Sequence, residues 1–90
     1  MPTISTFYGI IIRMYFNDSE QHHKPHFHAK YGKDEAVFDF DGNKLSGTFP
    51  YRQTKYVVAW ADIHQDELNA RWEIMQSEQE QDYFKIKGLE

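Results

Sequence analysis

The sequence contains no cysteine among its 90 residues. Disulfide frameworks, thiolate zinc sites and cysteine nucleophiles are therefore excluded together. Any metal ion would have to be bound by His, Asp or Glu side chains. The glycines are single and dispersed, so the chain also lacks a P-loop and a dinucleotide-binding fingerprint. No serine lies in a recognisable nucleophile elbow, which leaves little support for a serine hydrolase.

Long apolar runs and an excess of basic residues are also missing. No stretch approaches the roughly 20 apolar residues of a membrane-spanning helix, and the N-terminal MPTISTFYG does not resemble a secretory signal. We therefore expect a soluble cytoplasmic protein without a membrane partner. Ten basic residues against 14 acidic ones give a formal net charge of −4. This balance argues against a protein that mainly binds a phosphate backbone, so nucleic acid is not the favoured partner.

Apolar and aromatic residues are well represented, at 40% and 17% of the chain. This amount is enough for one globular domain, which we place over residues 1–90. The pattern changes at Pro50, from strand-like before it to helical after it. The sequence therefore predicts a single α+β domain.

The first half of the chain has four stretches with the composition or the alternation of β-strands. They are Ile4–Phe16, His26–Tyr31, Glu35–Phe40 and Lys44–Phe49. The first is expected to be one long strand, with a bulge or a close approach of another backbone at Gly9. Asp41-Gly42 is a strong hairpin signal between the last two. Together they predict an antiparallel meander sheet of about four strands.

The second half has helical periodicity from about Arg52 to Gln79, where apolar residues recur at three- and four-residue spacing. The apolar stripe comprises Val57, Trp60, Ala61, Ile63, Leu68, Trp72, Ile74 and Met75. We expect one long helix packed across the sheet. His64 interrupts the stripe and should be substantially buried and hydrogen-bonded, because an unpaired buried imidazole is costly. The closing stretch, Tyr83–Leu89, is either a short strand or a tail on the core.

Four of the five histidines lie within residues 22–28, HHKPHFH. Alternation along the strand that follows defines two faces. The histidine face carries His26, His28 and Lys30, and the apolar face carries Phe27, Ala29 and Tyr31. Two histidines at i and i+2 on a strand can both bind one zinc or nickel ion, and His64 is the natural third ligand. These three residues are the candidate metal ligands if the helix covers the histidine face.

Burial of the apolar face is the favoured alternative, because its side chains gain more from leaving water. His26 and His28 would then face solvent or a partner, and His64 would be a core histidine. A catalytic pair without metal is as open as the metal site, with His28 or His64 as general base oriented by an acid such as Asp39 or Glu67. The candidate catalytic set is His26, His28, His64, Arg13 and Glu67, in which the arginine would stabilise phosphate charge.

Three motifs together resemble a bacterial family of small proteins catalogued as domain-of-unknown-function family 4160. The motifs are FYGI with the following RMY, the strand HFHA-x-Y, and the helix W-x-x-x-H-x-x-EL-x-x-x-W. The matching residues are Phe7, Tyr8, Gly9, Arg13, Met14, His26, Phe27, His28, Tyr31, Trp60, His64, Glu67, Leu68 and Trp72. No reaction is established for the family, so the resemblance transfers no catalytic role.

The resemblance implies a partner, because family members are often encoded beside another short protein, as in a two-gene module of the toxin–antitoxin type. The leading hypothesis is a protein-binding component that pairs with this small protein through an exposed sheet edge or the histidine face. The alternative is a small histidine-dependent hydrolase or ribonuclease, with or without a divalent metal ion such as zinc or nickel. Net acidity and the lack of a nucleophile favour the first. A homo-oligomer is compatible with both.

Overall fold

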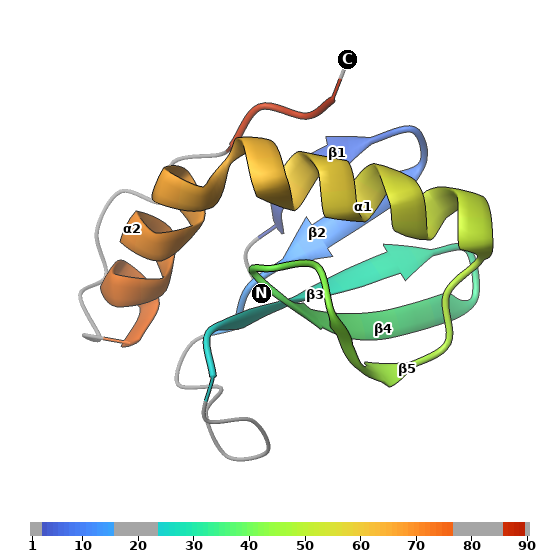
Figure 1. Cartoon of the computed structure of the whole chain (residues 1–90), viewed down its shortest axis with the longest axis horizontal. Coiled ribbons are helices and arrows are strands. Elements are labelled where there is room, and N and C mark those ends of the chain that lie inside the picture. The colour runs from blue at the N-terminus through green and yellow to red at the C-terminus, as the bar shows by residue number, and fades with distance from the viewer. Residues whose placement is uncertain (1–2, 16–23, 77–85, 90) are drawn as a thin grey trace.

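Residues 3–15, 24–76 and 86–89 are described in a computed structural model of the chain, and within them lie five strands and two helices (Figure 1). In chain order these are β1 Thr3–Phe7, β2 Ile10–Arg13, β3 His26–Tyr31, β4 Asp34–Asp39, β5 Lys44–Gly47, α1 Tyr51–Ile63 and α2 Gln65–Gln76. Each strand pairs antiparallel with its neighbour in the chain, so the sheet order is β1-β2-β3-β4-β5. The predicted α+β fold with an antiparallel meander is confirmed.

The stretch predicted as one long strand is a β-hairpin, which corrects the strand count from about four to five. Phe7 of β1 lies opposite Ile10 of β2, so Tyr8 and Gly9 form a two-residue turn. Their φ angles are +50° and +79°, and a type I′ turn requires positive φ at both positions. Asn, Asp or Gly usually occupies the first position. A tyrosine there, between two β-branched and aromatic runs, gave no turn signal.

The single long helix of the prediction is also wrong, because the helix breaks at His64. α1 ends at Ile63, His64 has φ −110° and ψ 33°, and α2 begins at Gln65. The His64 N–H still donates to the Trp60 carbonyl, but the two helices run in different directions (Figure 1). Ile63 is consequently 64% exposed although it was counted in the apolar stripe. Neither described helix is long and apolar enough to cross a membrane.

The core lies between α1 and the apolar face of the sheet, as apolar matching predicted. The Trp60 ring stacks on Phe7 and meets Phe27 edge-on, with ring centroids 5.4 Å apart in both pairs. The other buried members of the cluster are Ile4, Ile10, Ile12, Met14, Ala29, Ala36, Phe38, Phe40, Phe49, Val57, Ala61, Leu68 and Ile86. Burial of these side chains is the main favourable term in the folding of a domain this small.

The described part of the C-terminal segment packs on β1 without forming a strand. The Ile86 N–H donates to the Ile4 carbonyl at 2.7 Å, and Trp60 Nε1–H donates to the Lys87 carbonyl at 3.0 Å. A Cβ atom added to Gly88 would lie 2.8 Å from the Thr6 carbonyl oxygen, so a larger residue would displace the segment. The predicted tail is therefore found for residues 86–89. Residues 77–79 of the predicted helix, residues 83–85 and the side chain of Met75 lie outside the described part.

We predict that Trp60→Ala lowers the free energy of unfolding by about 3–5 kcal/mol, because it empties the space between the two sheet phenylalanines. Urea unfolding followed by circular dichroism would measure the loss. Tyr51→Ala removes an aromatic ring that is 78% exposed and should cost less than about 0.5 kcal/mol. If Trp60→Ala does not fold, Trp60→Phe should show a smaller loss. Equal costs for the two alanine variants would contradict the described packing of α1.

Candidate functional site

The histidine face lies opposite α1 and extends onto the neighbouring strands. His28 is paired directly with Arg13 of β2 and with Val37 of β4, and Lys30 is paired with Glu35. Side chains of directly opposed residues in an antiparallel pair lie on the same face, about 5 Å apart at Cβ. Arg13, His28 and Lys30 are each partly exposed. The register therefore places Arg13, His28 and Lys30 on one face, with Glu35 beside Lys30.

His26 belongs to the same face, but it is buried, with 2% of its surface exposed. Its Nδ1 lies 2.8 Å from the Lys24 carbonyl oxygen, and because a carbonyl only accepts, Nδ1 carries the proton. The ring centroid is 5.6 Å from that of His28 and 5.1 Å from that of Trp72. His26 was expected to face solvent or a partner. This was wrong, because the turn at His64 brings Trp72 of α2 against the end of the sheet.

The imidazole of His28 meets the ring of Tyr15 edge-on, at 4.4 Å between centroids. The two histidine rings are thus held between Tyr15 on one side and Trp72 on the other. Sequence reasoning missed Tyr15. The available signal was its position two residues after Arg13, which places it on the same alternating set. His22 and His23 lie outside the described residues.

His64 and Glu67 form a separate pair in the helical layer. His64 Nδ1 lies 2.5 Å from Glu67 Oε1, and 13% of the His64 side chain is exposed. The imidazole also lies 5.7 Å from the Trp60 ring, which packs on the apolar face of the sheet. The expected burial and hydrogen bonding of His64 are therefore found. Of the candidate catalytic set, Arg13, His26 and His28 share one face, whereas His64 and Glu67 lie on the other side of the sheet.

The predicted three-histidine metal site gains no support from this arrangement. Among the residues that the structure describes, no group of three or more His, Asp or Glu side chains could hold a metal ion. His64 and the strand histidines are separated because the helices pack on the apolar face of the sheet and not on the histidine face. The helical layer that carries His64 covers Phe27 and Ala29, and the strand directs His28 away from it.

A buried carboxylate, Asp39, organises the end of β4 directly opposite His26. Its Oδ1 accepts the backbone N–H groups of Asp41 and Asn43, at 3.0 and 2.8 Å. Its Oδ2 accepts the Asn43 side-chain amide and the Lys24 ammonium, both at 3.0 Å. Lys24 therefore binds Asp39 with its side chain and His26 with its carbonyl. The sequence had suggested Asp39 only as an acid that orients a histidine.

Burial acts to raise the pKa of Asp39, but the hydrogen bonds outweigh it. The backbone and side-chain amides of Asn43 and the Lys24 ammonium all favour the ionised form. The net result is a pKa below the ordinary value of 3.8. The carboxylate is consequently ionised at neutral pH, and its ionisation stabilises the β4–β5 turn.

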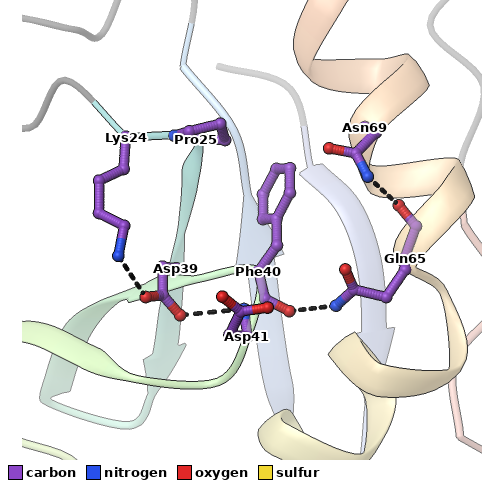
Figure 2. Close-up of a pocket in the computed structure, with 7 residues that line it drawn as sticks. All are labelled: Lys24, Pro25, Asp39, Phe40, Asp41, Gln65 and Asn69. Atoms are coloured by element: carbon purple, nitrogen blue, oxygen red, sulfur yellow. Dashed lines mark hydrogen bonds and ion pairs between the residues drawn. The ribbon is translucent and has the colours of Figure 1, made fainter.

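A pocket of about 200 Å³ lies beside this network, between the start of β3, the β4–β5 turn and α2. Its lining is Lys24, Pro25, Asp39, Phe40, Asp41, Gln65 and Asn69 (Figure 2). The Gln65 amide N–H donates to the Phe40 carbonyl and ties α2 to the end of β4. Sequence reasoning missed this pocket, because Gln65 and Asn69 have the composition of a solvated helix face.

We predict that Asp39→Asn lowers the free energy of unfolding at neutral pH by about 1–3 kcal/mol, because the new amide N–H₂ would face the Lys24 and Asn43 donors. A group with a lowered folded-state pKa stabilises the fold above its unfolded-state pKa and loses this contribution as the pH falls. The difference between the native protein and the variant should therefore shrink below about pH 3.8.

Urea titrations between neutral pH and pH 2.5 would measure this effect. The control is Asp62→Asn, which removes an exposed carboxylate on α1 and should change stability by less than about 0.5 kcal/mol. A difference between the native protein and Asp39→Asn that persists unchanged at the acid end would contradict the ionised network.

Comparisons with known proteins bear on the family of the chain and not on its activity. Neither the curated proteins nor the solved structures include a match. A family model described as a domain of unknown function (DUF4160) matches residues 9–73, which include every candidate site residue from Arg13 to Glu67. This match spans more than half of the chain and confirms the resemblance seen in the sequence motifs. The chain therefore belongs to the family described as domain of unknown function DUF4160.

Proposed function

We propose that this protein is the protein-binding component of a two-gene module and that it binds a small partner protein through the histidine face. The observation that carries the proposal is the Arg13–His28 pair, which lies partly exposed on the sheet face opposite α1. The pairing of β2 with β3 fixes the Arg13 guanidinium and the His28 imidazole side by side before a partner binds. Preorganisation reduces the entropy lost on association.

The other large surfaces of the sheet are less suited to a partner. The apolar face is covered by α1, and the outer edge of β1 carries residues 86–89. The β5 edge is short and irregular, with a bulge in its pairing to β4 and a φ of +90° at Gly47. Short and bulged edges are poor templates for an added strand. The histidine face is therefore the better candidate.

The side chains of this face fit the composition of known interfaces. Arg and Tyr are the residue types most often found among the side chains that dominate binding energy, and here Arg13 and Tyr15 flank His28. Ile11 is partly exposed on the same face and adds apolar area. The proposed partner is the product of an adjacent short gene, as the resemblance to this family implies.

The test is isothermal titration calorimetry with the co-expressed neighbouring gene product. We expect the double variant Arg13→Ala/His28→Ala to fold normally and to bind at least about tenfold more weakly, which corresponds to about 1.4 kcal/mol. The matched control is Arg52→Ala, which removes an exposed arginine on α1, in the other layer. Affinity that is equal in all three proteins would exclude the histidine face as the interface.

The same pair supports a second candidate function, a histidine-dependent hydrolase acting on a phosphodiester. Arg13 would stabilise phosphate charge while His28 transfers a proton, with His26 beside it. Purified protein would be incubated with single-stranded RNA, with and without zinc or nickel. The hydrolase hypothesis expects cleavage that His28→Ala abolishes and Arg52→Ala retains. The binding hypothesis expects the same low background from all three proteins.

A further inference from the structure

We propose that the pocket beside Asp39 binds a guanidinium group carried on an alkyl chain. The proposal does not rest on the proposed function, because Arg13, His28 and Lys30 do not line the pocket. It rests on which polar atoms of the pocket are already engaged. Both oxygens of Asp39 are occupied by four hydrogen bonds, and the Lys24 ammonium is paired with one of them. The Asp39 carboxylate and the Lys24 ammonium therefore neutralise each other and add no net charge to the pocket.

The side-chain amides of the pocket are oriented by the carbonyls they contact. Gln65 Nε2 lies against the Phe40 carbonyl and 3.1 Å from the Ala61 carbonyl, and Asn69 Nδ2 lies 3.0 Å from the Gln65 carbonyl. Carbonyls only accept, so the nitrogen of each amide must occupy these positions. The amide oxygens must then point the other way. In Figure 2 the Asn69 oxygen lies on the side of the Phe40 ring, and the Gln65 oxygen points away from the Phe40 carbonyl.

Asp41 adds a negative charge to these two acceptors. Its backbone N–H donates to Asp39, but within the described part of the chain its exposed carboxylate takes part in no ion pair. The residues that line the pocket thus include Gln65 and Asn69, whose amide oxygens point away from these carbonyls, and one acidic residue, Asp41. Because Lys24 is neutralised by Asp39, the remaining charge is that of Asp41. A positively charged donor is the complementary ligand.

A guanidinium group matches this lining better than an ammonium group. It is planar, carries five N–H donors and is more weakly hydrated, so it can donate to amide and carboxylate oxygens at once. Pro25 is exposed and offers apolar surface for the methylenes. The pocket volume of about 200 Å³ has room for the guanidinium and its last methylenes.

The experiment is a nuclear magnetic resonance titration of the full chain with three probes of similar length. These are Nα-acetyl-arginine methylamide, its citrulline analogue and its lysine analogue. The citrulline compound keeps the planar shape and loses the charge. We expect the arginine probe to shift the amide signals of Asp41, Gln65 and Asn69, with a dissociation constant at least tenfold lower than that of citrulline and lower than that of lysine.

The decisive variant is Asp41→Asn, which removes the charge and keeps the shape of an exposed residue. It should weaken binding of the arginine probe at least tenfold, whereas Asp66→Asn, on α2 outside the pocket, should leave it unchanged. Asn69→Leu, which removes one acceptor, should weaken it as well. Equal binding of arginine and citrulline probes, unchanged affinity in Asp41→Asn, or no shift at any residue of the pocket would each overturn the proposal.

Two further ligands identify the source of the guanidinium. Agmatine represents a free small molecule, and the acetylated and amidated peptide Gly-Arg-Gly represents an arginine of a protein partner. Tighter binding of agmatine would indicate a small-molecule site, and tighter binding of the peptide would indicate recognition of an arginine side chain. Both outcomes support the shared chemistry, and failure of both would refute it.

Discussion

The position of the Trp60 ring is the contact on which the rest of the structure depends. The ring lies against Phe7 and Phe27 and donates its N–H to the Lys87 carbonyl. One side chain therefore connects α1 to two strands and to the C-terminal segment. By fixing α1 on the apolar face, it also determines that the histidine face is left uncovered by α1. The surface proposed for a partner is a consequence of core packing.

The sequence predicts this part of the fold well, because alternation and helical spacing report burial directly. The sequence did not predict the turn at Tyr8 or the helix break at His64. Both features involve contacts between residues that are distant in the sequence. Tyr8 has a positive φ, and its ring lies 5.0 Å from that of Tyr56 on α1. Directly after His64, the side-chain amide of Gln65 donates to the Phe40 carbonyl at the end of β4. Local composition favours a continuous strand and a continuous helix in these places, and tertiary contacts override it.

The candidate site was predictable to the extent that it follows from strand register. Arg13 and His28 meet because β2 and β3 pair directly, and both lie in motifs that the sequence singles out. The burial of His26 was not predictable, because it requires Trp72 from beyond the helix break. The pocket beside Asp39 was not predictable either, because it also depends on the position of α2. Asp41 and Gln65 are distant in sequence and come together only when α2 reaches the end of β4.

The hydrogen bond between Ile86 and Ile4 has a consequence for the stoichiometry of self-association. A sheet with two open edges can add identical copies at both ends and grow into a fibre. Here residues 86–88 lie along β1, so among the described strands only β5 has an edge to offer. If two copies paired edge to edge through β5, each would use its one open edge on the other. Growth would then stop at a symmetric dimer.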